Sequence, residues 1–353
     1  MKIIKGFFKI IILIVLVLLV ATGTFIAYLS LKEYKPEAEE ELSIEKGEGK
    51  AESAKGEIRI LSFNIGYGGL GKNADFVLDG GSGNGKPESR ELFEEYFGSA
   101  LDFVRDSNCD VYLLQEVDRS SARSYKTDEI AELRNELGPQ SLVFANNYRC
   151  PYVPFPWPPI GKVDSGLLTV TDFDISSAVR KALPNPFSWP LRVANLKRAV
   201  LLSYIAVEGS DKQLCLINLH LEAYTAEEGR REQQELLLEI MREEYEKGNW
   251  VIAGGDFNQS FPGTRGTYPI IDESWVPGEL SDKELGESFS YVFDAETPTC
   301  RLLNKVYDKE TAQHYIIDGF IISENVELVS IKTHDLGFEF SDHNPVEIVV
   351  KLK

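Results

Sequence analysis

Sulfur is scarce in this sequence. Only four cysteines occur among 353 residues, and no two of them have the spacing of a metal-binding motif. A fold held together by a disulfide framework is therefore excluded, and a zinc site built from thiolates is disfavoured. No cysteine lies near the N-terminal apolar segment, which also excludes a lipid anchor of the lipoprotein type.

Positive charge is scarce as well. The chain has 37 Lys and Arg against 56 Asp and Glu, a formal net charge of -19. A broad nucleic-acid-binding face takes its affinity from Lys and Arg that displace counterions, and no run of these residues is present. The composition therefore disfavours nucleic acid as a partner, although folding could still assemble a basic patch. No segment indicates an obligate protein partner.

An apolar segment lies near the N-terminus, after a short basic stretch. The 22 residues from Ile10 to Leu31 carry no charge, and a helix of that length covers about 30 Å, the hydrocarbon thickness of a bilayer. We predict a short basic cytoplasmic tail over residues 1–9 and a transmembrane anchor over residues 10–31. A cleaved signal peptide is the alternative, but its apolar region is usually shorter.

The orientation of this anchor rests on the size of the domain behind it. Lysines are equally frequent on the two sides, but a short basic tail before a first helix and a large domain after it favour an N-terminus inside the cell. We therefore expect a single-pass protein of the cell membrane with its body outside the cytoplasm. Residues 32–57 are rich in glutamate and predict an acidic, solvated tether that is too polar to pack.

The body, residues 58–353, alternates short strand-like runs with a few periodic helices. We expect strands over residues 58–65, 111–114, 142–145, 199–207, 214–221, 250–253, 316–322 and 346–352. Helices are expected over residues 92–104 and 127–137, and from a capping box at Thr225 and Glu228 to Gly248. This pattern predicts a two-sheet α/β sandwich in one domain.

Five short polar motifs lie at the ends of the expected strands, where side chains leave the core and can converge. They are LSFNI at 61–65, LLQEVD at 113–118, NLHL at 218–221, GDFN at 255–258 and SDHNP at 341–345. Their carboxylate and amide oxygens suit a hard divalent cation such as Mg²⁺ or Mn²⁺. Together with two histidines, such a set could neutralise a phosphate and deprotonate a water. The motifs therefore indicate hydrolysis of a phosphate ester.

With these motifs in this order, the chain closely resembles the endonuclease/exonuclease/phosphatase superfamily of DNase I-like proteins. The resemblance runs from about residue 58 to the C-terminus and also includes DSGLLTV at 164–170 and IIDGF at 316–320. It implies a four-layered α/β sandwich of two mixed β-sheets flanked by helices. One departure is Gly319, because the family often has a tyrosine after the aspartate of that motif.

The resemblance also implies roles for individual residues. Glu116 would be the principal metal ligand, assisted by Asn64 and, directly or through water, by Asp342. His343 would be the general base, and the Asp318 carboxylate would orient it. His220 would bind the phosphate, and Asp256 and Asn258 would position the attacking water and a phosphate oxygen.

Two loops rich in proline and aromatic residues, 152–159 and 184–190, have two interpretations. Their Trp and Phe side chains could pack down as ordinary loop residues, or they could form a substrate rim or a wedge that touches a bilayer. Residues 66–85 contain eight glycines and predict a flexible loop beside the site.

These observations lead to one leading functional hypothesis and two alternatives. The first is a membrane-anchored phosphoesterase, dependent on Mg²⁺ or Mn²⁺, whose substrate is a phospholipid or another phosphorylated small molecule. The second is an extracytoplasmic Mg²⁺-dependent nuclease. The third, a surface binding module without catalysis, is disfavoured because Glu116, Asp256, His220 and His343 are all intact.

Overall fold

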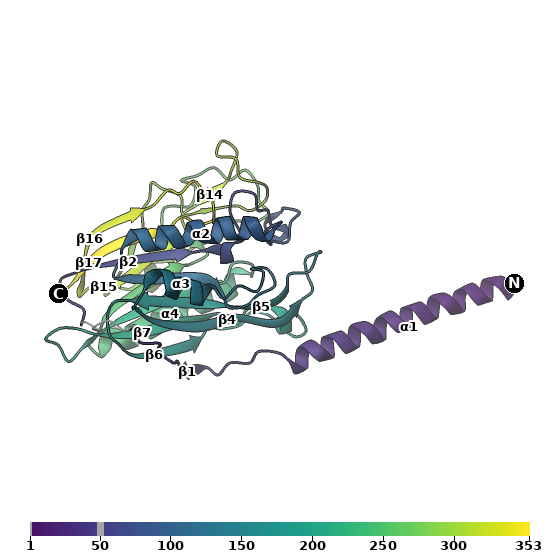
Figure 1. The fold of residues 1–353 in the computed structure, drawn as a ribbon, viewed down its shortest axis with the longest axis horizontal. Coiled ribbons are helices and arrows are strands. Elements are labelled where there is room, and N and C mark those ends of the chain that lie inside the picture. Colours follow the sequence, from purple (N-terminus) through teal and green to yellow (C-terminus); the bar gives the residue numbers. More distant parts are fainter. Residues whose placement is uncertain (1, 48–52) are drawn as a thin grey trace.

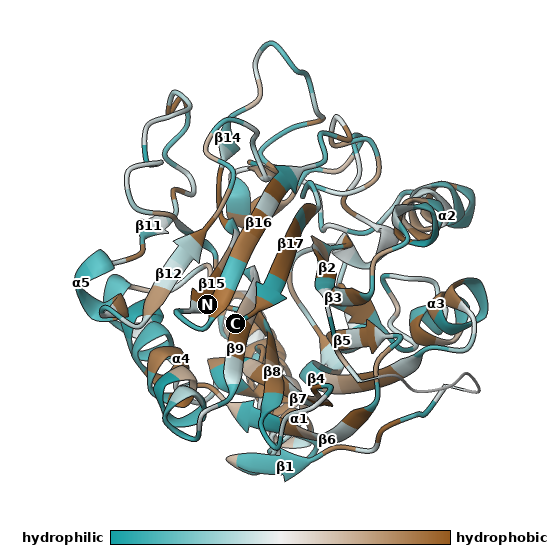
Figure 2. Cartoon of the chain, turned by 90° about the vertical axis from the view of Figure 1, so that its left-hand side faces the viewer, coloured by the Kyte–Doolittle hydropathy of each residue, from teal (hydrophilic) through white to brown (hydrophobic). Residues whose placement is uncertain are grey.

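Two mixed β-sheets lie face to face in the body of the protein, with helices on the outer face of each (Figures 1 and 2). The computed structural model describes residues 2–47 and 53–353. One sheet has six strands in the order β16 (Val326–Thr333), β17 (Val346–Leu352), β2 (Glu57–Asn64), β3 (Val111–Asp118), β5 (Gly161–Thr171) and β4 (Ser141–Val153). The four-layered architecture expected from the sequence is confirmed.

The second sheet has seven strands. Their order is β1 (Glu39–Glu41), β6 (Ile175–Ala182), β7 (Ala199–Ala206), β8 (Gln213–His220), β9 (Trp250–Asp256), β15 (Asp318–Ser323) and β12 (Phe289–Val292). Two short pairs lie outside these sheets, β10 (Gln259–Ser260) with β11 (Gly278–Glu279) and β13 (Cys300–Arg301) with β14 (His314–Tyr315). Strands β6 and β16 were not expected, because both expose several side chains and lack a clear apolar alternation.

The helices form the outer layers. They are α2 (Arg90–Ser107) and α3 (Glu129–Leu137) on the six-stranded sheet, and α4 (Glu227–Glu246) and α5 (Asp282–Leu285) on the seven-stranded one (Figure 2). The predicted capping box of α4 is wrong: its N-cap is Ala226, and no side chain caps it. Helix α3 begins two residues after the predicted start at residue 127, and Asp128 caps it by accepting a hydrogen bond from the Ala131 amide.

Apolar side chains fill all three spaces between the four layers. Ile60, Leu113 and Leu216 belong to the cluster between the sheets, and each is fully buried. Phe97 lies in the cluster under α2, and Leu237 lies in the cluster under α4. Because both faces of each sheet are covered, the sequences of the central strands are continuous runs of apolar residues.

The N-terminal helix α1 (Lys2–Leu31) projects from one end of the body (Figure 1). Its segment Ile4–Leu31 is long and apolar enough to cross a membrane, a test that a signal sequence near the N-terminus also passes. The helix begins before the predicted anchor, because residues 2–9 continue it toward the N-terminus, and the boundary between tail and anchor at residue 10 stays a prediction.

The segment after α1 differs from the predicted solvated tether. Residues Glu39–Glu41 form β1 and pair with β6, and Leu42 and Ile44 pack against the core between the sheets. Ala54 is fully buried in the same core. Backbone pairing needs no apolar side chain, so the acidic composition did not prevent this segment from joining the sheet. Residues 48–52 of the predicted tether lie outside the described residues.

Candidate active site

The site forms where the carboxyl ends of strands from both sheets meet. Strands β2 and β3 run parallel in one sheet, as β8 and β9 do in the other, so each pair ends at a common edge. His220 lies opposite Asp256 in the register of β8 and β9. The Asn64 amide Nδ2 donates across the two sheets to Asp256 Oδ2 at 3.1 Å.

Glu116 reaches this edge because β3 is irregular there. Its φ is +55°, in the left-handed region that non-glycine residues rarely adopt, and the register of β3 and β5 shifts between Leu114 and Val117. The Glu116 Oε1 atom accepts a hydrogen bond of 3.3 Å from Asn64 Nδ2. The irregularity thus turns a carboxylate out of an otherwise buried strand and toward the site.

His343 and Asp318 form a buried pair. The Nδ1 atom of His343 lies 2.8 Å from Asp318 Oδ2, which leaves Nε2 for other partners. Nε2 lies 3.7 Å from Asp256 Oδ2 and 4.0 Å from Asp342 Oδ2. Burial alone lowers the pKa of His343, but the carboxylates of Asp318, Asp256 and Asp342 raise it well above its ordinary value.

Asp318 is held firmly although Gly319 follows it. The Thr299 hydroxyl accepts a hydrogen bond of 3.0 Å from the Asp318 amide. A Cβ at position 319 would lie 2.7 Å from the Phe261 ring, which is fully buried. The missing tyrosine therefore does not loosen the aspartate, because Phe261 occupies the adjoining space.

His220 lies across the site, with Nε2 3.4 Å from Asp256 Oδ2. Among the described residues, its Nδ1 atom is buried and has no hydrogen-bond partner. Burial and the nearby Arg198 guanidinium lower the pKa of His220 well below its ordinary value. The neutral imidazole can therefore meet a phosphate oxygen as a hydrogen-bond donor without carrying a charge.

Hydrogen bonds hold Asp256 and Asn258 in position at the end of β9. The Asn258 amide N–H donates to Asp256 Oδ1 at 2.8 Å, and its side-chain Nδ2 donates to the Leu221 carbonyl at 2.9 Å. Asn258 has a φ of +50°, which brings its side chain back toward the strand end.

At two acids of the site, burial outweighs the positive charge nearby, which comes from His343 and, at Asp342, also from Arg301. Burial raises the pKa of Asp256 to about 6 and that of Asp342 to about 7, and the neighbouring Glu116 carboxylate adds to the rise at Asp342. Crowded carboxylate oxygens of this kind are the donor set that hard divalent cations take. The residues therefore fit a Mg²⁺ or Mn²⁺ ion.

The structure also shows a second grouping of donor atoms. Ligand atoms of Asp256, Asp318 and His343 all lie within 4.8 Å of one another. The predicted ligand Asn64 uses its amide oxygen to accept a hydrogen bond from the Gly66 N–H at 3.1 Å. The assignment of Glu116, Asn64 and Asp342 as metal ligands stays a prediction.

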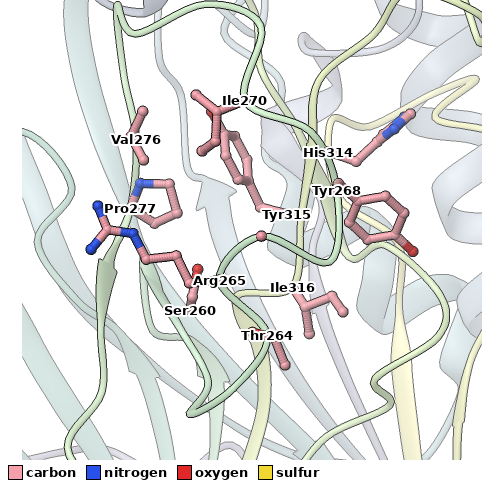
Figure 3. Close-up of a pocket in the computed structure, with 11 residues that line it drawn as sticks. Ser260, Thr264, Arg265, Tyr268, Ile270, Val276, Pro277, His314, Tyr315 and Ile316 are labelled. Carbon is pink, nitrogen blue, oxygen red and sulfur yellow. The ribbon is translucent and has the colours of Figure 1, made fainter.

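All eight predicted residues come together, but in two layers. Six of them line one cavity of about 630 Å³: Glu116, His220, Asp256, Asn258, Asp342 and His343. Asn64 and Asp318 stand behind them and hold them by hydrogen bonds. A second hollow of about 10 Å³, around Tyr268 and His314, is too small for more than a water molecule (Figure 3).

Sequence reasoning missed several residues of this cavity. Arg123 is buried and pairs with Asp118 at 3.0 Å, and Arg198 lies 3.5 Å from Glu222. Tyr224 donates its hydroxyl hydrogen to Asp79 at 2.7 Å. Asp118 within LLQEVD was the available signal for the first pair, because a carboxylate in a buried strand requires a partner.

Comparisons with known proteins agree with this geometry. The sequence matches the model of the Endonuclease/Exonuclease/phosphatase family over residues 61–343. The chain is similar to an endonuclease/exonuclease/phosphatase from Beutenbergia cavernae, with 16% identity, a TM-score of 0.56, and coverage of 84% of this chain and 72% of that one. No curated protein matches the sequence significantly.

Two further solved structures share the fold. One is an endonuclease/exonuclease/phosphatase from Bacteroides vulgatus, with 16% identity, a TM-score of 0.53, and coverage of 85% of this chain and 100% of the other. The second is a family protein from Leptotrichia buccalis, with 15% identity, a TM-score of 0.54, and coverage of 84% and 100%. At such identities the likeness shows the fold alone.

Proposed function

Because the chain belongs to the endonuclease/exonuclease/phosphatase family, whose members are hydrolytic phosphoesterases, we propose that it is a metal-dependent phosphoesterase held at a membrane by α1. The observation that carries the proposal is the meeting of four carboxylates with two histidines around one cavity. Glu116, Asp256 and Asp342 line that cavity, and Asp318 backs His343.

Three of the candidate residues are the metal ligands in this proposal. Glu116, Asn64 and Asp342 would hold a Mg²⁺ or Mn²⁺ ion, with Asn64 turning its amide oxygen toward the ion. When bound, such an ion neutralises phosphate charge and offsets the carboxylates that raise the pKa of His343.

The remaining residues act on the water and the phosphate. Asp318 accepts a hydrogen bond from His343 Nδ1, which fixes the ring and leaves Nε2 to remove a proton from the attacking water. Asp256 and Asn258 orient that water and a phosphate oxygen, and His220 donates to the phosphate. The buried position of these groups keeps bulk water from competing with them.

A lipid or another phosphorylated small molecule is the substrate class we propose. Of the three arginines that line the cavity, Arg123 and Arg198 are already opposite acidic partners, and the buried Arg301 donates to the backbone carbonyl of Gly71. Arg123 and Arg198 therefore offer less positive charge to a polyanionic strand than free arginines would. The body lies outside the cytoplasm in this proposal, as the basic N-terminus before α1 favours.

The experiment that tests the function uses the full chain in a maltoside detergent. The substrates are a 4-nitrophenyl phosphodiester, phospholipid vesicles and plasmid DNA, each with Mg²⁺, with Mn²⁺ and with EDTA. We expect hydrolysis of phospholipid or the small diester that EDTA abolishes and Asp256→Asn reduces at least about a hundredfold. The control Asp211→Asn changes a side chain that is 89% exposed and keeps activity.

Two results would contradict the proposal in different ways. Efficient cleavage of plasmid DNA without hydrolysis of the other substrates would favour the nuclease. No hydrolysis of any substrate with either ion would favour the binding module.

A further inference from the structure

The cavity that holds the proposed catalytic residues extends as far as the N-terminal helix. Phe25, Ile26 and Leu29 of α1 line the same cavity of about 630 Å³ as Glu116 and His343. One cavity therefore has carboxylates and histidines at one end. Its other end is a wall made by the last turns of a helix that is apolar enough to cross a membrane.

Specific contacts dock this part of α1 on the body. Leu29 is 3% exposed and packs in a cluster with Val153, Val163 and Val193. The Trp189 indole N–H donates to the Ser30 hydroxyl at 3.0 Å. Just beyond the helix, the buried Glu33 carboxylate accepts a hydrogen bond of 3.1 Å from Arg192. The helix is thus a fixed wall of the cavity.

The lining beside α1 is mostly apolar, although Asn147, Ser165 and Asn195 also belong to the cavity. It is made by the end of β4, the loop after it and the segment around the 3₁₀ helix η3 (Leu191–Ala194), with side chains of Val153, Phe155, Ile160, Phe187, Leu191 and Leu196. Phe155 and Leu191 are 58% and 64% exposed, and the neighbouring Trp157 is 82% exposed. Large exposed apolar side chains beside a membrane helix are typical of a surface that contacts lipid.

The length of α1 places this wall at the edge of a bilayer. From Lys9 to Leu29 the helix rises about 30 Å, which matches the hydrocarbon thickness. With Lys9 at one membrane surface, Phe25, Ile26 and Leu29 lie near the opposite surface. An apolar chain could then pass from the bilayer into the cavity without crossing water.

We infer that the apolar part of this cavity holds the hydrocarbon chain of a phosphate ester drawn from the bilayer, with α1 as part of the substrate site. This inference rests on the proposed function, because the phosphate is placed at the carboxylates and histidines. Nucleotides and sugar phosphates do not suit this region, since its side chains offer few hydrogen bonds to hydroxyl groups or bases. The cavity volume lies within the usual range of roughly 300–1,000 Å³ for small-molecule sites.

The experiment is a chain-length series on the full protein in maltoside micelles. The probes are 4-nitrophenyl alkyl phosphodiesters and alkyl phosphate monoesters, each with methyl, butyl, octyl and dodecyl chains, assayed with Mg²⁺ and with Mn²⁺. We expect kcat/KM to rise with chain length, by up to about fourfold per buried methylene, and to level off once the cavity is filled.

Matched variants separate the cavity from simple partitioning into micelles. Ile26→Trp fills the cavity wall and should reduce the dodecyl-to-methyl ratio of kcat/KM at least about tenfold. Ile14→Trp makes the same change on an exposed part of α1 outside the cavity, and should keep the wild-type ratio. Ile26→Ala introduces no clash and should shift the levelling-off to longer chains.

The outcomes distinguish this inference from the proposed function. Hydrolysis at equal rates for all chain lengths, or equal ratios in Ile26→Trp and Ile14→Trp, would overturn the inference and leave a phosphoesterase. No hydrolysis of either series by the wild-type protein would contradict the proposed function itself.

Discussion

At His343, burial and charge act on the pKa in opposite directions. Burial disfavours the imidazolium, whereas three surrounding carboxylates favour it and prevail. A general base must be neutral before the reaction, and a cation bound among these carboxylates would favour the neutral imidazole by lowering this pKa.

Replacing His343 tests its role directly. We expect His343→Ala to lower kcat by about 10² to 10⁴ fold, the usual contribution of a general base, with an unchanged circular dichroism spectrum. His334→Ala is the matched control, because His334 pairs with Glu347 outside the cavity. Retained activity in His343→Ala would remove this residue from the mechanism.

Replacing Asp318 tests positioning through the pH profile. Asp318 raises the pKa of His343, so Asp318→Asn should lower that pKa. Activity is lost as the pH falls through the pKa of the base, and the acid limb of the kcat profile should therefore move to lower pH. The plateau should also fall, because the ring loses its orienting carboxylate. An unshifted acid limb would argue that Asp318 acts only in the fold.

At the scale of single elements, irregularities bring the functional side chains into place. The bulge in β3 directs the Glu116 carboxylate toward the site, and the turn after β9 directs the Asn258 side chain back toward the end of that strand. Directly after β2, the 3₁₀ turn η1 (Gly66–Gly68) brings Gly66 against Asp342. A Cβ on Gly66 would lie 3.2 Å from Asp342 Oδ1, and its φ is +55°.

Gly66→Ala therefore has two expected effects. The positive φ should cost about 1 kcal/mol of unfolding free energy, and the new methyl group should push Asp342 away. Gly209→Ala is the control, because its φ is +77° and nothing lies within 4 Å of the added Cβ. We expect similar losses of stability in urea titrations. Only Gly66→Ala should raise the Mg²⁺ concentration that gives half-maximal activity.

At the scale of the whole molecule, the site joins the two sheets. Asn64 and Glu116 come from the six-stranded sheet, while His220, Asp256 and Asp318 come from the seven-stranded one. A cation bound there is bound by the folded state alone, because unfolding separates its ligands. Binding should therefore stabilise the entire body.

Thermal unfolding with and without Mg²⁺ checks this expectation. At a Mg²⁺ concentration 100 times the dissociation constant, the stabilisation is about 2.7 kcal/mol, which corresponds to a rise of about 5 °C in Tm for a domain of this size. Glu116→Gln should abolish most of the rise, whereas Asp211→Asn should retain it. An equal rise in both variants would exclude Glu116 as a ligand.

The sequence alone determined the two-sheet sandwich and, through the resemblance of its motifs to a known family, indicated eight candidate residues that the fold brings together. Alternating and continuous apolar runs dictate which faces are buried, and polar residues at strand ends have no place in the core. Local patterns of this kind can be recognised without a structure. They were sufficient to predict β2, β8 and the meeting of Asp256 with His343.

Only the tertiary structure decided how the parts outside those patterns are used. The pairing of β1 with β6, the space that Phe261 takes beside Gly319, and the docking of Leu29 in the cavity wall each depend on a partner far away in the chain. An acidic segment can join a sheet edge through its backbone, and an apolar helix can line a cavity as well as span a bilayer. Composition does not distinguish these outcomes, because distant contacts select among them.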